Sequence, residues 1–110
     1  MGRETVEASL AMELRRGTIV LMVLGVLEQP TYGYKLAEEL ALKGMPIDGN
    51  TLYPLLRRLS SQGLLTDSWD TSQTKPRKYY RLTKEGKRVR SALRKQWETQ
   101  ARAMDDLYQK

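Results

Sequence analysis

The stretch that decides the fold reads DGNTLYPLLRRLSSQG and spans residues 48–63. Its leucines recur at helical spacing rather than in alternation, which predicts an amphipathic helix. Asp48 can cap this helix, although Asp48-Gly49 alone could also form a hairpin turn. Pro54 limits the start of the helix to about residues 49–51, because proline is tolerated only near the first turn, and Gly63 ends it. The inward-facing leucines are Leu52, Leu55, Leu56 and Leu59.

Two short segments follow, residues 64–70 and 78–82, which are rich in Thr, Trp, Tyr and Leu. This composition predicts β-strands. The loop between them, residues 71–76, is polar and is followed by basic side chains. A helix followed by a basic hairpin is the layout of a winged helix-turn-helix, which can place the helix in a DNA groove and the hairpin on neighbouring phosphates.

Three further helices are predicted. Residues 10–28 form one whose second half is apolar on nearly every side, and such a helix has to be buried on every side. A second chain would complete that burial, and Gly17 and Gly25 would permit its close approach. Thr31 is expected to cap a helix over residues 32–43, and Thr83 is expected to cap a final helix that runs to about Tyr108.

The final helix carries a single apolar stripe at steps of three and four residues. At 1.5 Å per residue the helix is about 37 Å long, which exceeds what one globule with a radius of gyration near 13 Å can cover. The stripe is therefore predicted to pair with an identical chain in a two-fold homodimer. Its members are Val89, Leu93, Trp97, Ala101, Met104 and Tyr108.

The composition suits one domain of 110 residues. Cysteine and histidine are both absent from the sequence, which excludes disulfides, metal sites built on these residues and serine-histidine triads. No nucleophile–base pair or phosphate loop is present, so we expect neither an enzyme nor a cofactor. Residues 19–27 are too short an apolar run to span a bilayer, and no signal peptide is visible. We therefore expect a cytoplasmic protein that makes no membrane contact.

The net charge of +6 is concentrated in one segment. Residues 75–95 contain ten Lys or Arg and one acid, whereas residues 1–50 contain five basic and seven acidic residues. Such a concentrated positive field favours a polyanionic partner. Lys75, Arg77 and Lys78 of the hairpin are predicted to contact phosphates, whereas the cations over residues 87–95 could equally form a solvated helix face.

The outward face of the helix at residues 48–63 is predicted to contact double-stranded DNA. Asn, Tyr and Arg side chains can bond base edges or phosphates, and the free N–H groups at a helix start favour an anion. Tyr53 could instead pack in the core, and Tyr34 could either pack or bond phosphate through its hydroxyl. The predicted DNA-binding residues on the helices are Tyr34, Asn50, Thr51, Tyr53, Arg57 and Arg58.

The sequence contains two tryptophans, Trp69 and Trp97. Trp97 lies in the middle of the terminal stripe and is either a packing residue of a dimer interface or part of a cavity for a planar ligand. In the second case Leu93 and Met104 would line the same effector site. Trp69, on the first strand of the hairpin, is expected to be a packing residue.

Four motifs resemble, in order and spacing, the PadR family of bacterial transcriptional regulators over roughly residues 10–97. They are Leu14-Arg15-Arg16-Gly17-Thr18, Tyr32-Gly33-Tyr34-Lys35-Leu36, and the segments at residues 48–56 and 78–86. The resemblance implies a homodimeric winged-helix repressor that binds a palindromic operator and is often released by a small molecule. Trp97 follows Gly86 by eleven residues, which is similar to the pore tryptophan of LmrR-like multidrug-sensing members of the short branch. That similarity implies stacking of Trp97 on planar apolar or cationic drugs.

The sequence thus predicts a mainly helical α+β fold, a winged helix-turn-helix with a long C-terminal dimerisation helix. We expect residues 1–83 to form the DNA-binding domain and residues 84–110 to form the dimerisation helix. The predicted function is regulation of a nearby operon by a homodimeric repressor. The alternative is a winged-helix protein-interaction module that does not bind DNA, although the uneven charge argues against it.

Overall fold

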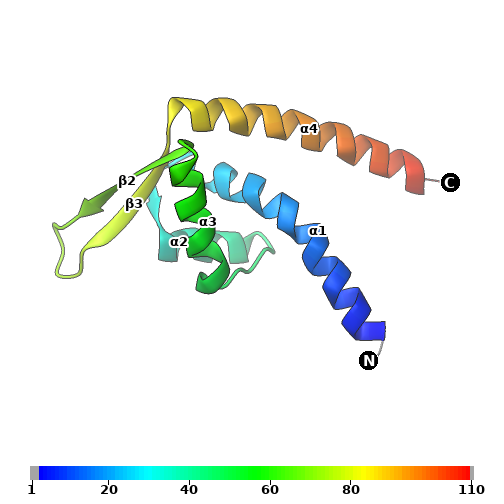
Figure 1. Cartoon of the computed structure of the whole chain (residues 1–110), viewed down its shortest axis with the longest axis horizontal. Coiled ribbons are helices and arrows are strands. Elements are labelled where there is room, and N and C mark those ends of the chain that lie inside the picture. The colour runs from blue at the N-terminus through cyan, green and yellow to red at the C-terminus, as the bar shows by residue number, and fades with distance from the viewer. Residues whose placement is uncertain (1–2, 110) are drawn as a thin grey trace.

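The computed structural model describes residues 3–109, with four helices and a small antiparallel sheet (Figure 1). This arrangement confirms the predicted mainly helical α+β fold. None of the helices in this part of the chain is long and apolar enough to cross a membrane. In chain order the elements are α1 (Arg3–Val26), β1 (Thr31–Tyr32), α2 (Gly33–Leu42), α3 (Gly49–Ser61), β2 (Leu65–Asp70), β3 (Arg77–Leu82) and α4 (Lys84–Tyr108).

The core lies between α1, α2, α3 and one face of the sheet. The four leucines of α3 are all buried, which confirms the face assigned from their spacing. Because burial of one leucine stabilises the fold by about 1.5–3 kcal/mol, these side chains fix the rotation of α3 about its axis. The other buried apolar residues are Val23, Leu24, Leu27, Leu36, Leu40, Leu65, Tyr80 and Leu82.

The sheet has three strands in the order β1-β3-β2. Strands β2 and β3 form the predicted hairpin, here called the wing, with Leu65 opposite Leu82 at its base and Asp70 opposite Arg77 at its tip. Strand β1 was not predicted, because its two residues become a strand only by pairing with β3. Thr31 belongs to β1 and does not cap α2, so that prediction is wrong. Tyr32 occupies the cap position and forms no side-chain capping bond.

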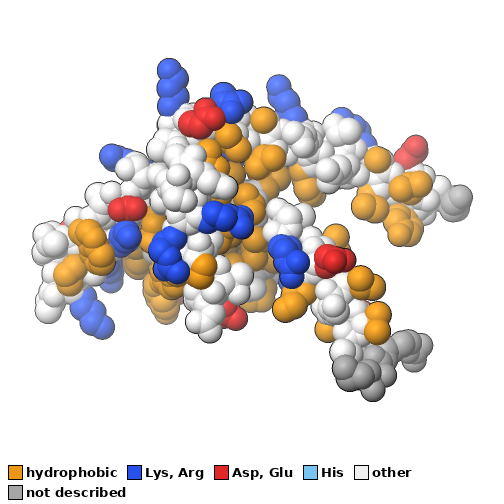
Figure 2. Space-filling model, in the orientation of Figure 1, with side chains coloured by type: hydrophobic (Ala, Val, Ile, Leu, Met, Phe, Trp, Pro, Cys, Tyr) orange, Lys and Arg blue, Asp and Glu red, His pale blue; other side chains and the backbone are white. Residues whose placement is uncertain are grey.

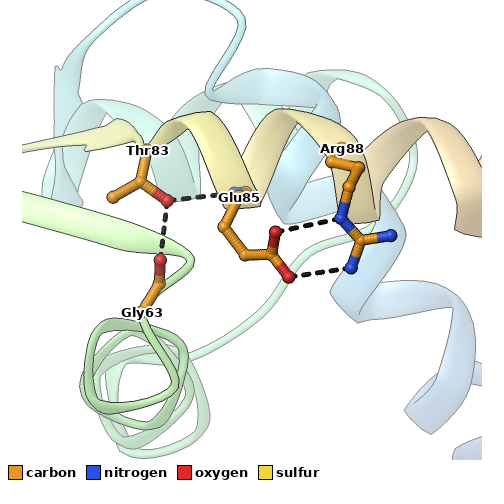
Figure 3. Close-up of polar contacts among 5 residues, drawn as sticks. Gly63, Thr83, Glu85 and Arg88 are labelled. Carbon is orange, nitrogen blue, oxygen red and sulfur yellow. Dashed lines mark hydrogen bonds and ion pairs between the residues drawn. The ribbon is translucent and has the colours of Figure 1, made fainter.

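The predicted caps of α3 and α4 are confirmed. Asp48 Oδ1 accepts a hydrogen bond of 2.9 Å from the backbone N–H of Thr51. Thr83 Oγ1 accepts one of 2.9 Å from the N–H of Gly86, and its own hydroxyl donates to the carbonyl of Gly63 at 2.6 Å (Figure 3). Gly63 itself has a φ of 82°, a left-handed conformation that suits glycine after a helix.

Helix α1 extends further toward the N-terminus than predicted. It begins at Arg3 rather than at residue 10 and ends at Val26. The added turns contain good helix formers such as Glu and Ala, but Val6 is their one large apolar residue in helical register with Leu10 and Leu14. The expectation from periodicity therefore missed them.

The two long helices diverge like arms from a shared end (Figure 1). Arg90 on α4 donates to the Glu28 carboxylate just beyond α1, at 2.6 Å. The radius of gyration is 16.2 Å, compared with about 13 Å for a compact chain of this length. The accessible surface is 8483 Å², compared with about 6,200 Å² for a typical monomer of this mass. Exposed apolar side chains on the arms are Val6, Leu10, Met12, Leu14, Trp97, Met104, Leu107 and Tyr108.

Candidate nucleic-acid interface

Helix α3 presents a polar face to solvent, opposite its buried leucines. With 3.6 residues per turn, burial of the leucines turns the residues between them outward. The predicted DNA-binding residues of α3 are accordingly all exposed, and their contact with DNA remains a prediction. These residues are Asn50, Thr51, Tyr53, Arg57 and Arg58.

A groove of about 720 Å³ lies between the C-terminal half of α3 and the wing. Three cations line it, Arg57 and Arg58 from α3 and Lys78 from β3, and Asp67 contributes a carboxylate. Burial raises the pKa of the Tyr80 hydroxyl, and nearby Asp67 raises it further. Tyr80 therefore remains a neutral wall of a positively charged groove. Ser60 and Ser61 complete its lining.

Lys78 is held in this groove by two aromatic rings. Its Nζ lies 5.9 Å from the ring centroid of Trp69 and 5.8 Å from that of Tyr80, within the range of a cation–π contact. Trp69 is 63% exposed, so the prediction that it packs is wrong. Its strand pairs with β3, but beyond Leu65 most of β2 is exposed, and the indole is left uncovered.

Arg77 points to the other face of the sheet, because successive strand residues alternate. Its guanidinium carbon lies 4.4 Å from the ring centroid of Tyr32. The Tyr32 ring in turn meets the Tyr79 ring edge to face, with centroids 5.3 Å apart. The wing thus carries one stacked cation on each face. The contact of Arg77 with Tyr32 could not be predicted from local patterns, since it depends on the pairing of β1 with β3.

Lys75 is exposed in the loop of the wing. The start of this loop is held by Asp70, whose Oδ1 accepts from the backbone N–H of Ser72 at 3.0 Å and from its hydroxyl at 2.7 Å. These hydrogen bonds lower the pKa of the Asp70 carboxyl. Lys75 therefore follows an ordered turn, beside the tip of the wing.

Tyr53 lies between α3 and the start of α2. Its ring sits against Gly33, where an added Cβ would lie only 2.5 Å from Tyr53 Cε1. The side chain is nevertheless 41% exposed, so it packs on one side and faces solvent on the other. Tyr34, the next residue after Gly33, is 69% exposed. The alternative that Tyr34 packs in the core is therefore wrong.

The predicted effector residues share one stripe of α4. Leu93 is half-buried and packs against the core, whereas Trp97 is 43% exposed and Met104 is also exposed. At 1.5 Å per residue, Trp97 lies about 6 Å along the axis from Leu93 and about 10 Å from Met104. In the single chain these side chains form an open helix face.

The sequence profile of the transcriptional regulator PadR-like family matches residues 20–92. The chain belongs to the PadR family. A PadR family transcriptional regulator from Eggerthella lenta has a crystal structure similar to this one, with a TM-score of 0.87 and 49% identity over 96% of this chain and 95% of that chain. A transcriptional regulator from Clostridium thermocellum gives a TM-score of 0.81 at 27% identity, covering 88% and 99% of the two chains. Transcriptional regulator Rv3488 of Mycobacterium tuberculosis is 31% identical over 91 residues, which are 82% of this chain and 85% of that protein.

The PadR family and these relatives are transcriptional regulators and not enzymes, which confirms the predicted class of function. The PadR match runs from the second half of α1 to the first third of α4. It therefore includes the whole winged helix-turn-helix. It stops before Trp97 and Met104 and begins after Arg16.

Proposed function

We propose that this PadR protein binds double-stranded DNA as a homodimer, with α3 in the major groove and the wing on the phosphates. The observation that carries the proposal is the groove in which Arg57, Arg58 and Lys78 converge beside the polar face of α3. Arginine and lysine at such an edge bind phosphate oxygens, while a helix fits the major groove. Residues 1–83 would form this DNA-binding domain.

Side chains at the start of α3 would read or position the bases. Asn50, Thr51 and Tyr53 are exposed there, and Tyr34 is exposed next to the Gly33–Tyr53 contact, where its hydroxyl could bond phosphate. Lys75 and Arg77 would contact phosphates from the loop and the second face of the wing. A two-fold dimer would place its two copies of α3 about 34 Å apart, one turn of DNA, which requires a palindromic operator.

The uncovered arms support homodimerisation. The accessible area exceeds that of a typical monomer by roughly 2,200 Å², which is on the order of the area that one chain contributes to an obligate dimer. Apolar side chains are exposed on both arms. Residues 84–110, together with the N-terminal half of α1, would form the interface.

We further infer that the dimer represses a nearby operon in the cytoplasm and is released by a small molecule. A planar apolar or cationic effector would bind near the dimer interface, on Leu93, Trp97 and Met104. If the effector favours a dimer in which the copies of α3 are misspaced for DNA, then the effector weakens DNA binding. By linkage, DNA weakens effector binding by the same factor.

A mobility-shift titration tests DNA binding, using fragments upstream of the protein's own gene and its neighbours over roughly 50–200 mM salt. We expect a shift that weakens steeply with salt. Replacing Arg77 and Lys78 with Ala should lower the log–log salt slope by up to about one unit for each lost phosphate contact. If no fragment shifts at low salt, the result favours the alternative function, a winged-helix protein-interaction module that does not bind DNA.

Fluorescence tests the effector site independently. Trp69 is exposed and would contribute to the signal, so the titration uses a Trp69→Phe background in which Trp97 is the remaining tryptophan. Planar cationic dyes are expected to quench or shift its emission. If the emission of Trp97 does not change up to the highest soluble dye concentration, Trp97 is a packing residue and not part of an effector site.

A further inference from the structure

A second groove, of about 310 Å³, lies between α1 and the start of α3. Arg15 and Arg16 enter it from α1, and Asp48 and Thr51 enter it from α3. Both arginines are exposed, and neither takes part in the ion pairs found among the described residues. The Asp48 carboxylate is already engaged as the cap of α3. The remaining lining residues are Met12, Ile19, Pro46 and Ile47.

The two cationic grooves lie at opposite ends of α3. The first brings Arg57, Arg58 and Lys78 to its C-terminal half, and the second brings Arg15 and Arg16 to its start. Figure 2 shows Lys and Arg side chains spaced across one face of the molecule, over the wing, over α3 and over the middle of α1. The positive surface beside α3 therefore continues onto α1.

The arginines lie on a different side of α1 from its exposed apolar stripe. Five residues at about 100° each place Arg15 some 140° around the helix from Leu10. Val6, Leu10 and Leu14 accordingly border a separate, shallow surface. A partner chain that covers this stripe would leave the arginines facing α3 and solvent.

We propose that Arg15 and Arg16 contact the DNA phosphates next to the bases that the start of α3 faces. This inference rests on the proposed function, because it requires α3 to lie in the major groove. A guanidinium pairs with phosphate through two parallel hydrogen bonds, and such contacts fix the position of a protein on the duplex without reading sequence. Helix α1 then contacts the partner chain with one side and the DNA backbone with another.

The test compares Arg15→Gln and Arg16→Gln with Arg102→Gln, a matched loss of one exposed arginine from the distal part of α4 that lies more than about 90° around the helix from the apolar stripe of the proposed interface. Each of the first two variants should lower the log–log salt slope of DNA binding by up to about one unit. Each of these variants should lose affinity for operator DNA and for random DNA to a similar extent, because phosphate contacts carry no sequence information. Arg102→Gln should bind with the wild-type slope.

Phosphate ethylation interference locates the contacts directly. In the wild type, ethylation of one or two particular phosphates should block binding, and in Arg15→Gln and Arg16→Gln it should no longer do so. Lys78→Ala should abolish interference at different phosphates. Wild-type slopes in both α1 variants, together with a lowered slope in Lys78→Ala, would overturn the inference and leave DNA binding by α3 intact. Dissociation of the variants into monomers by sedimentation would also overturn it, because the arginines would then act at the interface. If the wild-type protein binds no DNA, the proposed function itself is contradicted.

Discussion

Gly86 lies in the first turn of α4 at a point where no side chain would fit, because the backbone of Leu64 lies too close. An added Cβ would overlap the Leu64 carbonyl oxygen, which already accepts from the N–H of Thr83. The first turn of α4 can therefore lie directly on the chain entering β2. This close approach explains why glycine, a poor helix former, occurs in the first turn.

The substitution Gly86→Ala should lower the free energy of unfolding by about 1–3 kcal/mol, the usual cost of overpacking a tight site. Backbone atoms are the obstacle, so no side-chain rotation can relieve the overlap. Urea denaturation at one fixed protein concentration measures the effect. Lys87→Ala, the exposed neighbour in the same helix, is the control and should change stability by no more than about 0.5 kcal/mol. Equal stability of the two variants would contradict the packing described here.

Gly33 has a different role, because its neighbour is a side chain that can move. Gly33→Ala should displace the Tyr53 ring, which is the atom group within 3 Å of the added Cβ, while leaving the fold stable. DNA affinity should fall by about 1 kcal/mol, the scale of one hydrogen bond. Tyr53→Ala should cause a similar loss, and the double variant should lose little more, because both changes remove one contact. Additive losses would show that Gly33 does not act through Tyr53.

At the scale of elements, the hydroxyl of Thr83 joins three parts of the fold. It caps α4 at Gly86, and it donates to Gly63, the second residue after α3 (Figure 3). Thr83 itself follows β3. One side chain therefore links the end of α3, the end of the wing and the start of α4.

Thr83→Ala should destabilise the protein by about 1–2 kcal/mol, the range for loss of a helix N-cap, with the Gly63 carbonyl also losing its donor. Thr83→Ser retains the hydroxyl and should keep most of that stability. Thermal and urea unfolding of the two variants give the comparison. If serine proves as damaging as alanine, the methyl group rather than the hydrogen bonds is responsible.

At the scale of the whole molecule, the dominant feature is the pair of diverging arms. Their apolar residues are uncovered in the single chain, and the radius of gyration is that of an open shape. Hydrophobic surface on this scale usually marks an interaction site. We propose that a second copy of the chain covers both arms at once.

Leu14→Glu should convert a dimer into monomers at micromolar concentration, because it places a charge in the apolar stripe of α1. Leu14 is 71% exposed in the single chain, so the substitution should leave the monomer folded. Sedimentation velocity and circular dichroism measure the two effects. Trp69→Glu, an equally drastic change on the wing, should remain dimeric. A wild-type protein that sediments as a monomer would contradict the proposed dimer.

Local patterns of residues were enough to predict α2, α3, α4 and the wing, together with the caps by Asp48 and Thr83. Apolar periodicity and capping chemistry act within one or two turns of chain, so they can be recognised locally. The exposure of Asn50, Arg57 and Arg58 followed from the same leucine spacing. Together with Lys75, Arg77 and Lys78 of the wing, these residues are the part of the candidate interface that could be predicted.

Which distant segments meet became visible in the folded chain and not before. Pairing of Thr31 with Tyr80 created β1 and brought Tyr32 beneath Arg77, and it removed Thr31 from its expected role as a cap. The same packing left Trp69 and Tyr34 exposed and placed Arg15 and Arg16 beside α3. Such contacts join residues far apart in the chain, and their free energy depends on the shape of the assembled core rather than on any local pattern.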